Sequence, residues 1–268
     1  MSSPNRYSQI IEQVFFAHFK KGATEVEFER HEIEEHAAKL KIVLPKNVGD
    51  IIYSFRYRAL LPELIQKQAT EGKEWIIRPA GRSKYKFVML ANNPLVPNKM
   101  LSETKILDAT PGIVLKYAMD DEQGLLAKVR YNRLIDIFMG VTCYSLQNHL
   151  RTTVPEVGQI ETDEIYVGVD SRGAHFIFPV QAKGGTDKLS IVQIEQDSAL
   201  CAHRFHDLVC QPIAVQFMED GQIALFAFED SAEGLKISSE KHYRLVTKDE
   251  LTDEELRSYK SRTESQAR

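Results

Sequence analysis

Residues 158–185 read GQIETDEIYVGVDSRGAHFIFPVQAKGG and hold two β-prone runs around a short polar turn. The runs, residues 160–170 and 174–183, are rich in Ile, Val, Tyr and Phe, which favour strands. Residues 171–173 (Ser-Arg-Gly) separate them, and glycine readily takes the left-handed conformation that closes a three-residue hairpin loop. The pattern therefore predicts a β-hairpin.

The length of the loop decides which residues of the two strands face each other. With three loop residues, the numbers of paired residues sum to 344, so Asp163 faces Gln181 and Glu161 faces Lys183. Because side chains alternate between faces and cross-strand neighbours lie about 5 Å apart, these four polar groups share one face. A two-residue loop changes the sum to 343 and divides the set between both faces. We expect the three-residue loop, since only this register gathers the set.

Two carboxylates, an amide and an ammonium on one ladder suit a hard divalent cation. Mg²⁺ takes oxygen ligands, usually one or two carboxylates together with water and substrate phosphate. The expected ligands are Asp163, Gln181 and the carbonyl oxygen of Ala182, with Glu161 in support. Lys183 is expected to orient the attacking water and to offset charge in the transition state. The alternative is a surface ladder in which a Glu161–Lys183 ion pair contributes less than about 1 kcal/mol.

The spacing D-x17-Q-x-K on a hairpin that precedes a helix resembles the PD-(D/E)xK nuclease superfamily, which has the restriction-endonuclease-like fold. Residues 130–230, with the runs SLQNHLRTTV, GQIETDEIYVG, PVQAKG and IEQD, resemble bacterial restriction endonucleases of that superfamily. The resemblance implies that Asp163 is the metal-binding acid and that Gln181 and Lys183 occupy the second and third motif positions. Glu161 matches an acid found two residues earlier in some branches. Gln181 departs from the commoner carboxylate and removes a charge from the site.

The resemblance also implies an activity and partners. It implies a type II site-specific deoxyribonuclease of a restriction system, which hydrolyses double-stranded DNA with Mg²⁺ and leaves 5′-phosphate ends. A homodimer that cuts both strands and a companion DNA methyltransferase in the same host are further implications. A helix acid often completes such sites, and Asp136, in the helix expected over residues 131–140, is our candidate.

The beginning of the chain predicts three helices and then a hairpin over residues 75–90, and Pro62 inside the third helix predicts a kink or a break near Leu61. This order is typical of a winged helix-turn-helix, whose recognition helix enters the DNA major groove. Cations on the third helix and the wing are expected to contact phosphates, namely Arg56, Arg58, Arg78, Arg82, Lys84 and Lys86. A solvated hairpin in a protein–protein module is the alternative.

A polar, strand-like run, CYSLQNHLRTTV, precedes the central hairpin. Its side chains Gln147, His149 and Arg151 are of the kinds that contact phosphates and base edges, so we expect them to line a DNA cleft. An exposed edge strand is the alternative.

The composition narrows the class of protein. With 43% hydrophobic and 27% charged residues, the 268-residue chain is globular and not disordered. Three cysteines exclude a disulfide framework, and the run C-x-H-x2-H-x3-C over residues 201–210 lacks the paired spacing of structural zinc sites. No apolar run reaches the roughly 18 residues of a membrane span, and the first residues lack the order of a secretory signal. We therefore expect a cytoplasmic protein without a membrane partner.

Charge alone does not identify a nucleic-acid partner. Residues 1–95 hold 15 Lys and Arg against 11 Asp and Glu, and the remainder holds 19 against 27, so a mildly basic part precedes an acidic one. The positions of the cations therefore matter more than their total.

We expect a mixed α/β protein of two domains. A winged-helix DNA-binding domain spans residues 1–92, a linker spans 93–108, an α/β/α nuclease domain with a mixed sheet spans 109–250, and a helical, fraying tail spans 251–268. The expected function is Mg²⁺-dependent cleavage of DNA. The alternative is a non-catalytic winged-helix regulator with a decayed nuclease domain, which the neutral Gln181 favours.

Overall fold

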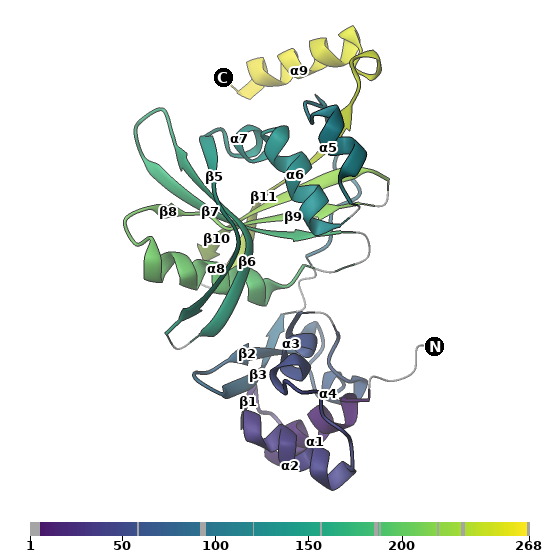
Figure 1. Ribbon diagram of the computed structural model, residues 1–268, viewed down its shortest axis with the longest axis vertical. Coiled ribbons are helices and arrows are strands. Elements are labelled where there is room, and N and C mark those ends of the chain that lie inside the picture. Colours follow the sequence, from purple (N-terminus) through teal and green to yellow (C-terminus); the bar gives the residue numbers. More distant parts are fainter. Residues whose placement is uncertain are drawn as a thin grey trace. The chain divides into compact units, whose positions relative to one another are not determined.

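The computed structural model describes residues 6–57, 59–91, 95–119, 121–155, 157–184, 187, 189–218, 220–231 and 234–266. The fold is mixed α/β, as the sequence predicts (Figure 1). The chain divides into two compact units. The first comprises Met1–Val96, Arg151–Glu161 and Lys188–Arg204, and the second comprises Pro97–Leu150, Thr162–Asp187 and Phe205–Arg268.

The first unit contains short helices and a three-stranded sheet. Its elements are α1 (Ser8–His18), β1 (Glu25–Glu29), α2 (Arg30–Leu40), α3 (Gly49–Tyr57), α4 (Glu63–Gln66), β2 (Lys73–Pro79), β3 (Lys84–Ala91) and α8 (Ile191–Arg204). The strands are ordered β1-β3-β2 and all pairs are antiparallel. The break expected at Pro62 is present, because α3 ends at Tyr57 and α4 begins only after the proline.

Aromatic side chains fill the core of this unit. The ring of Phe15 on α1 lies 5.1 Å from the rings of both Trp75 and Phe87, edge to face, and all three side chains are buried. Edge-to-face aromatic pairs contribute about 0.5–1.5 kcal/mol beyond the burial of their area. They fix α1 against the β2–β3 hairpin.

The second unit is built on a mixed, eight-stranded sheet ordered β4-β11-β10-β9-β7-β6-β5, with β8 beside β7. Its strands are β4 (Glu103–Leu107), β5 (Thr142–Val154), β6 (Gly158–Val169), β7 (His175–Lys183), β8 (Val209–Cys210), β9 (Ile213–Phe217), β10 (Gln222–Ser231) and β11 (Gly234–Val246). Its helices are α5 (Gly112–Tyr117), α6 (Glu122–Tyr131), α7 (Leu134–Met139), a 3₁₀ turn (Lys248–Glu250) and α9 (Asp253–Gln266). The distal parts of β5 and β6, Arg151–Glu161, belong to the first unit.

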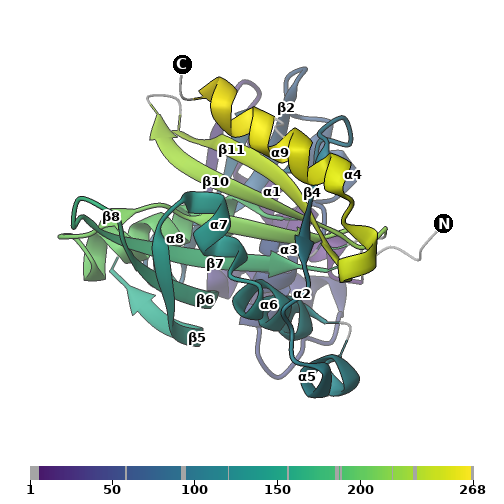
Figure 2. The ribbon, with the colours of Figure 1, turned by 90° about the horizontal axis from the view of Figure 1, so that it is seen from above.

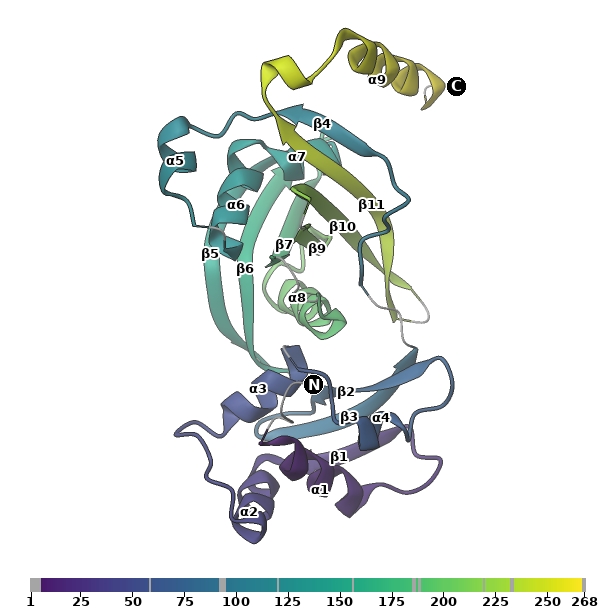
Figure 3. The same ribbon diagram turned by 90° about the vertical axis from the view of Figure 1, so that its right-hand side faces the viewer.

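Helices α6 and α7 pack on the sheet of the second unit. Leu125, Leu126 and Val129 of α6 join one buried cluster with Phe178 and Val180 of β7. Figure 2 shows the twist of the sheet, and Figure 3 shows α6 and α7 beside β5, β6 and β7. This packing places the first residue of α6 near the end of β7, which matters for the site below.

Three segments differ from the sequence prediction. Strand β4 lies inside the expected linker, residues 93–108, and pairs in parallel with β11. Helix α6 begins well before the expected helix over residues 131–140, of which only α7 forms. The two short strands expected over residues 235–248 are one strand, β11, which pairs along its length with β10.

The tail forms a helix, as expected. The Thr252 hydroxyl accepts a hydrogen bond from the backbone N–H of Glu255, and the carboxylate of Glu255 accepts one from the backbone N–H of Thr252. This is the predicted capping box. Among the described residues, no helix combines the length and the apolar character needed to cross a membrane.

Candidate active site

The β6–β7 hairpin has the predicted three-residue loop. Paired residues run from Glu164 opposite Val180 to Val169 opposite His175, so their numbers sum to 344 throughout. The backbone N–H of Asp170 donates to the carbonyl oxygen of Ala174 at 3.1 Å, and Gly173 has a φ of +83°. A glycine is needed at that left-handed position. The predicted register is therefore confirmed over the length of this ladder.

Asp170 closes the loop with its side chain. Its Oδ1 accepts hydrogen bonds from the backbone N–H groups of Ala174 and Arg172, each at 2.9 Å. These donors, Ala174 first, lower the pKa of the Asp170 carboxyl below its ordinary value. The loop that sets the register is thus held by a charged side chain as well as by glycine.

The ladder ends at the site itself. Among the described residues, the β6–β7 ladder runs from Val169–His175 to Glu164–Val180, so the expected pairs Asp163–Gln181 and Glu161–Lys183 lie beyond it. On its other edge, β7 pairs in parallel with β9 over Val180–Lys183. The Asp163 Oδ2 atom accepts a hydrogen bond from the backbone N–H of Ala182 at 2.8 Å. The expected acid and the middle of the Q-x-K run are therefore neighbours, joined by a side chain and not by backbone pairing.

Lys183 contacts an acid that the sequence analysis missed. Its Nζ atom lies 2.8 Å from the Oε1 atom of Glu122, the first residue of α6. The Lys183 side chain is 14% exposed and that of Glu122 is 38% exposed, so the pair sits at the edge of the core. Asp121 caps the helix by accepting from the backbone N–H of Gly124 at 2.8 Å. This cap, D-x-x-G before an apolar pattern, is the sequence signal that could have located Glu122.

Asp136, our candidate for the helix acid, has other partners. Its carboxylate accepts a hydrogen bond from the backbone N–H of Cys143 at 2.9 Å and pairs with Arg133. These contacts fix the turn between α7 and β5. Burial and the nearby Asp136 charge raise the pKa of the Cys143 thiol to about 12. Glu122 is therefore the helix acid that contacts Lys183, whereas Asp136 contacts Cys143 and Arg133.

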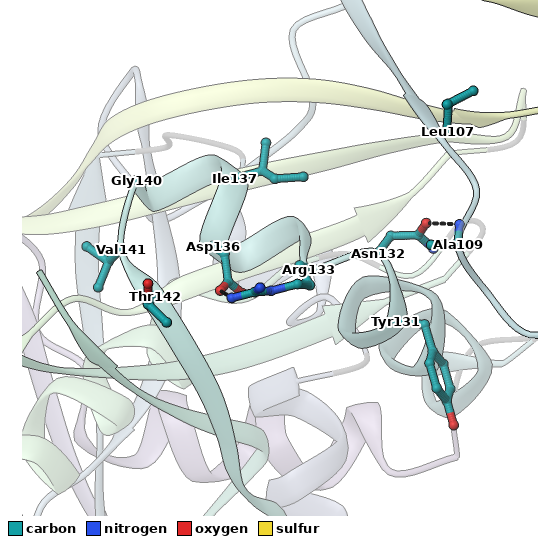
Figure 4. Close-up of a pocket in the computed structure, with 10 residues that line it drawn as sticks. All are labelled: Leu107, Ala109, Tyr131, Asn132, Arg133, Asp136, Ile137, Gly140, Val141 and Thr142. Atoms are coloured by element: carbon teal, nitrogen blue, oxygen red, sulfur yellow. Dashed lines mark hydrogen bonds and ion pairs between the residues drawn. The ribbon is translucent and has the colours of Figure 1, made fainter. Parts of the chain in front are cut away.

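Asp136 also lines a cavity of about 480 Å³ in the second unit (Figure 4). The buried Asn132 forms part of its wall, and its amide already bonds Ala109, Asp108 and Thr110. Because these polar groups are engaged with one another, we assign the cavity no ligand.

Behind the hairpin, Glu164 forms a buried polar cluster. Its side chain is fully buried, and its Oε1 atom accepts from Arg130 Nε at 2.8 Å and from Ser145 Oγ at 2.6 Å. The hydrogen bond with Glu164 raises the pKa of Arg130, so the guanidinium is firmly charged. Burial, and next the Glu164 charge, raise the pKa of the Tyr166 phenol.

Glu161 is engaged with a residue that we expected to contact DNA. Arg151 Nε lies 3.2 Å from Glu161 Oε2, and both residues belong to the first compact unit. The two charges offset each other. Of the other residues of β5 expected in a DNA cleft, Gln147 and His149 are exposed, and His149 has a left-handed φ of +51°.

Two expected DNA contacts, Arg56 and Arg78, do not lie in open solvent. Within the first unit, Arg78 pairs with Glu195 of α8, and the Tyr57 hydroxyl donates to Gln196 of α8 at 2.7 Å. The guanidinium of Arg56 lies over the ring of Tyr57 at 4.7 Å, and burial lowers its pKa. Sequence patterns could not foresee this, because α8 comes more than a hundred residues later. Arg58 lies outside the described residues.

The expected wing cations have acidic neighbours. Lys86 Nζ lies 2.9 Å from Glu25 Oε1, and Lys84 Nζ lies 3.8 Å from Glu29 Oε1. Both acids are on β1, which pairs with β3. The wing sequence contains no acid, but the strand beside it supplies two. Arg82, in the turn, is exposed.

The oxygen donors near Ala182 fit Mg²⁺ by their chemistry. Asp163, Glu122, the buried Gln181 amide and the Ala182 carbonyl offer oxygen alone, which suits a hard cation and not zinc. Within the described ranges, no three His, Cys, Asp or Glu side chains are grouped closely enough to hold a metal ion by themselves. An amide oxygen, a carbonyl and substrate phosphate would therefore have to complete the ligand set.

Comparison with protein-family models, curated proteins and solved structures finds no match to this chain.

Proposed function

We propose that this chain is a Mg²⁺-dependent endonuclease that cuts double-stranded DNA at a specific sequence. One observation carries the proposal. The Q-x-K run of β7 meets an acid on each side, since Ala182 bonds Asp163 and Lys183 bonds Glu122. Two carboxylates, an amide and a lysine around one strand end are the groups that phosphodiester hydrolysis needs.

The topology supports this proposal. The antiparallel β6–β7 pair followed in the chain by helix α8 matches the hairpin-then-helix order on which the resemblance rests, and β9 parallel to β7 makes the sheet mixed, as expected. The resemblance of D-x17-Q-x-K to the PD-(D/E)xK superfamily adds to it. We propose that residues 109–250 contain this core.

Different residues of the chain are proposed to bind the metal ion and to stabilise the transition state. Asp163, Gln181, the Ala182 carbonyl and Glu122 would hold the cation, and Glu161 is left to its pair with Arg151. When bound, Mg²⁺ polarises the phosphate and lowers the pKa of a water ligand. Lys183 would exchange Glu122 for a phosphate oxygen and donate to it as negative charge develops in the transition state.

The first unit is proposed to bind the DNA. Its helices and its β1-β3-β2 sheet follow the order of a winged helix-turn-helix. Exposed Arg82 on the wing supports a phosphate contact there, whereas Arg56 and Arg78 would first have to leave their present partners. From the resemblance we further propose a homodimer and a companion methyltransferase, and from the composition a cytoplasmic location.

A second candidate is a non-catalytic DNA-binding regulator with a decayed nuclease domain. Two observations favour it. Gln181 contributes no charge, and Lys183 is already paired with Glu122. The two candidates share the DNA-binding surface and differ only in metal-dependent cleavage.

Incubating the pure protein with mixed-sequence duplex DNA, with Mg²⁺ or with EDTA, tests the proposal. We expect discrete fragments with Mg²⁺ alone, and none from Lys183→Ala even though that variant still binds duplex. Lys236→Ala, which changes a surface lysine paired with Glu229, is the matched control and should cut normally. Duplex binding without cleavage under every condition would favour the regulator, and normal cleavage by Lys183→Ala would place the active site elsewhere.

A further inference from the structure

Helix α6 is tied to the two site strands at opposite ends. Glu122 at its first position binds Lys183 of β7, and Arg130 in its last turn binds Glu164 of β6, both at 2.8 Å. The helix has ten residues, so these ties are separated by about 12–15 Å along its axis. A rigid helix fixed at one end determines where its other end lies.

The tie at Arg130 is not a surface ion pair. The Glu164 side chain has no exposed area, so its charge depends on Arg130 and on the Ser145 hydroxyl for compensation. Arg130 also donates from Nη2 to Asn148 Oδ1 on β5 at 3.3 Å. One guanidinium thus connects the end of α6 to both β6 and β5.

Glu164 is the neighbour of Asp163 in the chain. Successive side chains of a strand point to opposite sides, and here Glu164 reaches α6 while Asp163 reaches the Ala182 amide. Glu164 also forms the last recorded pair of the β6–β7 ladder, with Val180. Moving Glu164 would therefore move Asp163 as well as the helix that carries Glu122.

We propose that Arg130 and Glu164 are positioning residues of the candidate active site. They set the point at which Glu122 meets Lys183 and hold Asp163 against Ala182. The catalytic consequence rests on the proposed nuclease function, whereas the positioning itself does not.

A cycle of single and double variants separates positioning from mere stability. Arg130→Lys keeps the charge but loses the guanidinium geometry, and it should lower kcat by about 10- to 100-fold with little change in the KM for duplex. Glu122→Gln should lower kcat similarly, and the double variant should be no slower than the slower single variant, because both act on the same contact. Independent effects would instead multiply, and that result would overturn the proposal. Arg133→Lys, whose arginine pairs with Asp136 on an exposed turn, is the control and should cut normally.

A second readout does not need cleavage. Lys183 is 14% exposed and paired, so reductive methylation followed by mass spectrometry should modify it slowly in the wild type. Arg130→Lys and Glu122→Gln should both speed its modification severalfold, and Arg133→Lys should not. If Arg130→Lys fails to fold, Ser145→Ala removes one hydrogen bond to Glu164 and serves instead. Unchanged Lys183 modification in a folded variant would overturn the proposal, whereas a wild type that does not cut would refute only the nuclease function.

Discussion

The Oδ2 atom of Asp163 lies 2.8 Å from the backbone nitrogen of Ala182, where a carbonyl of β6 would stand if the ladder continued. The carboxylate therefore has a structural task beside any catalytic one. Asp163→Asn keeps an acceptor oxygen and should remain as stable as the wild type, yet it should not cut DNA because the charge for the metal is lost. Asp163→Ala leaves the N–H without an acceptor and should lower the free energy of unfolding by about 1–2 kcal/mol.

Urea unfolding of both variants measures this difference. Equal destabilisation by Asn and Ala would show that the hydrogen bond to Ala182 contributes little. Full cleavage by Asp163→Asn would show that this charge is not needed at the site.

Gln181 offers a test of metal binding that does not depend on cleavage. Gln181→Glu introduces a carboxylate at a position that is 1% exposed. Without metal, this buried charge should lower the free energy of unfolding by about 1–3 kcal/mol. Mg²⁺ should raise the Tm of this variant more than that of the wild type, because a ligand that binds only the folded state stabilises it by mass action. Gln147→Glu, at an exposed position of β5, is the control and should not respond to Mg²⁺.

The wing cations should contribute unequally to DNA binding. Arg82 is exposed, whereas Lys86 forms an ion pair with Glu25. Arg82→Ala should reduce the slope of log K against log salt by about 0.9, the value for one neutralised phosphate, and Lys86→Ala should reduce it less. Glu25→Gln should strengthen binding by freeing Lys86. Gel-shift titrations at several salt concentrations measure all three, and equal effects of Arg82→Ala and Lys86→Ala would contradict the assignment.

Stability should depend on the ionisation of Asp170. Its pKa in the folded protein is lowered from the ordinary value of 3.8, first by the backbone hydrogen bond from Ala174. A depressed pKa contributes stability above the unfolded pKa, and the contribution is lost as the pH falls through the folded value. Asp170→Asn should therefore be less stable than the wild type at pH 7, and the difference should shrink below about pH 3.8. Chemical unfolding at both pH values checks this, and a constant difference would argue that the charge is irrelevant to the loop.

Local chemistry explains which elements could be predicted. The loop before Ala174 could be predicted because the glycine at residue 173 readily takes the left-handed backbone conformation, which other residues avoid. The break at Pro62 follows equally from the missing N–H of proline. Lys86 was correctly placed on the second strand of the β2–β3 hairpin, but its partner Glu25 depends on which strands pair, and local periodicity contains no such information.

In the candidate site, too, some residues could be predicted from local sequence and others depend on tertiary packing. Asp163, Gln181 and Lys183 could be proposed from spacing, and the register that motivated them is confirmed next to them. The contact of Glu122 with Lys183 could not be predicted, because it joins residues 61 positions apart through the packing of α6 on the sheet, although the Asp121 cap marks where that helix begins. The end of the β6–β7 ladder at Val180 was also out of reach, because no local pattern marks it and because β9 pairs with the other edge of β7.

The end of the β6–β7 ladder at Val180 has a consequence for protein engineering. Grafting the letters D-x17-Q-x-K onto an ordinary two-stranded hairpin would transfer the motif without the third strand. In such a host the backbone of the second strand would bond its neighbour throughout, and the aspartate would find no amide to cap. A functional transplant would need the whole junction, in which β9 pairs with Val180–Lys183 along one edge of β7 and the β6 ladder on the other edge stops at Glu164. The smallest transferable part is thus three strands and one helix, and not a sequence signature.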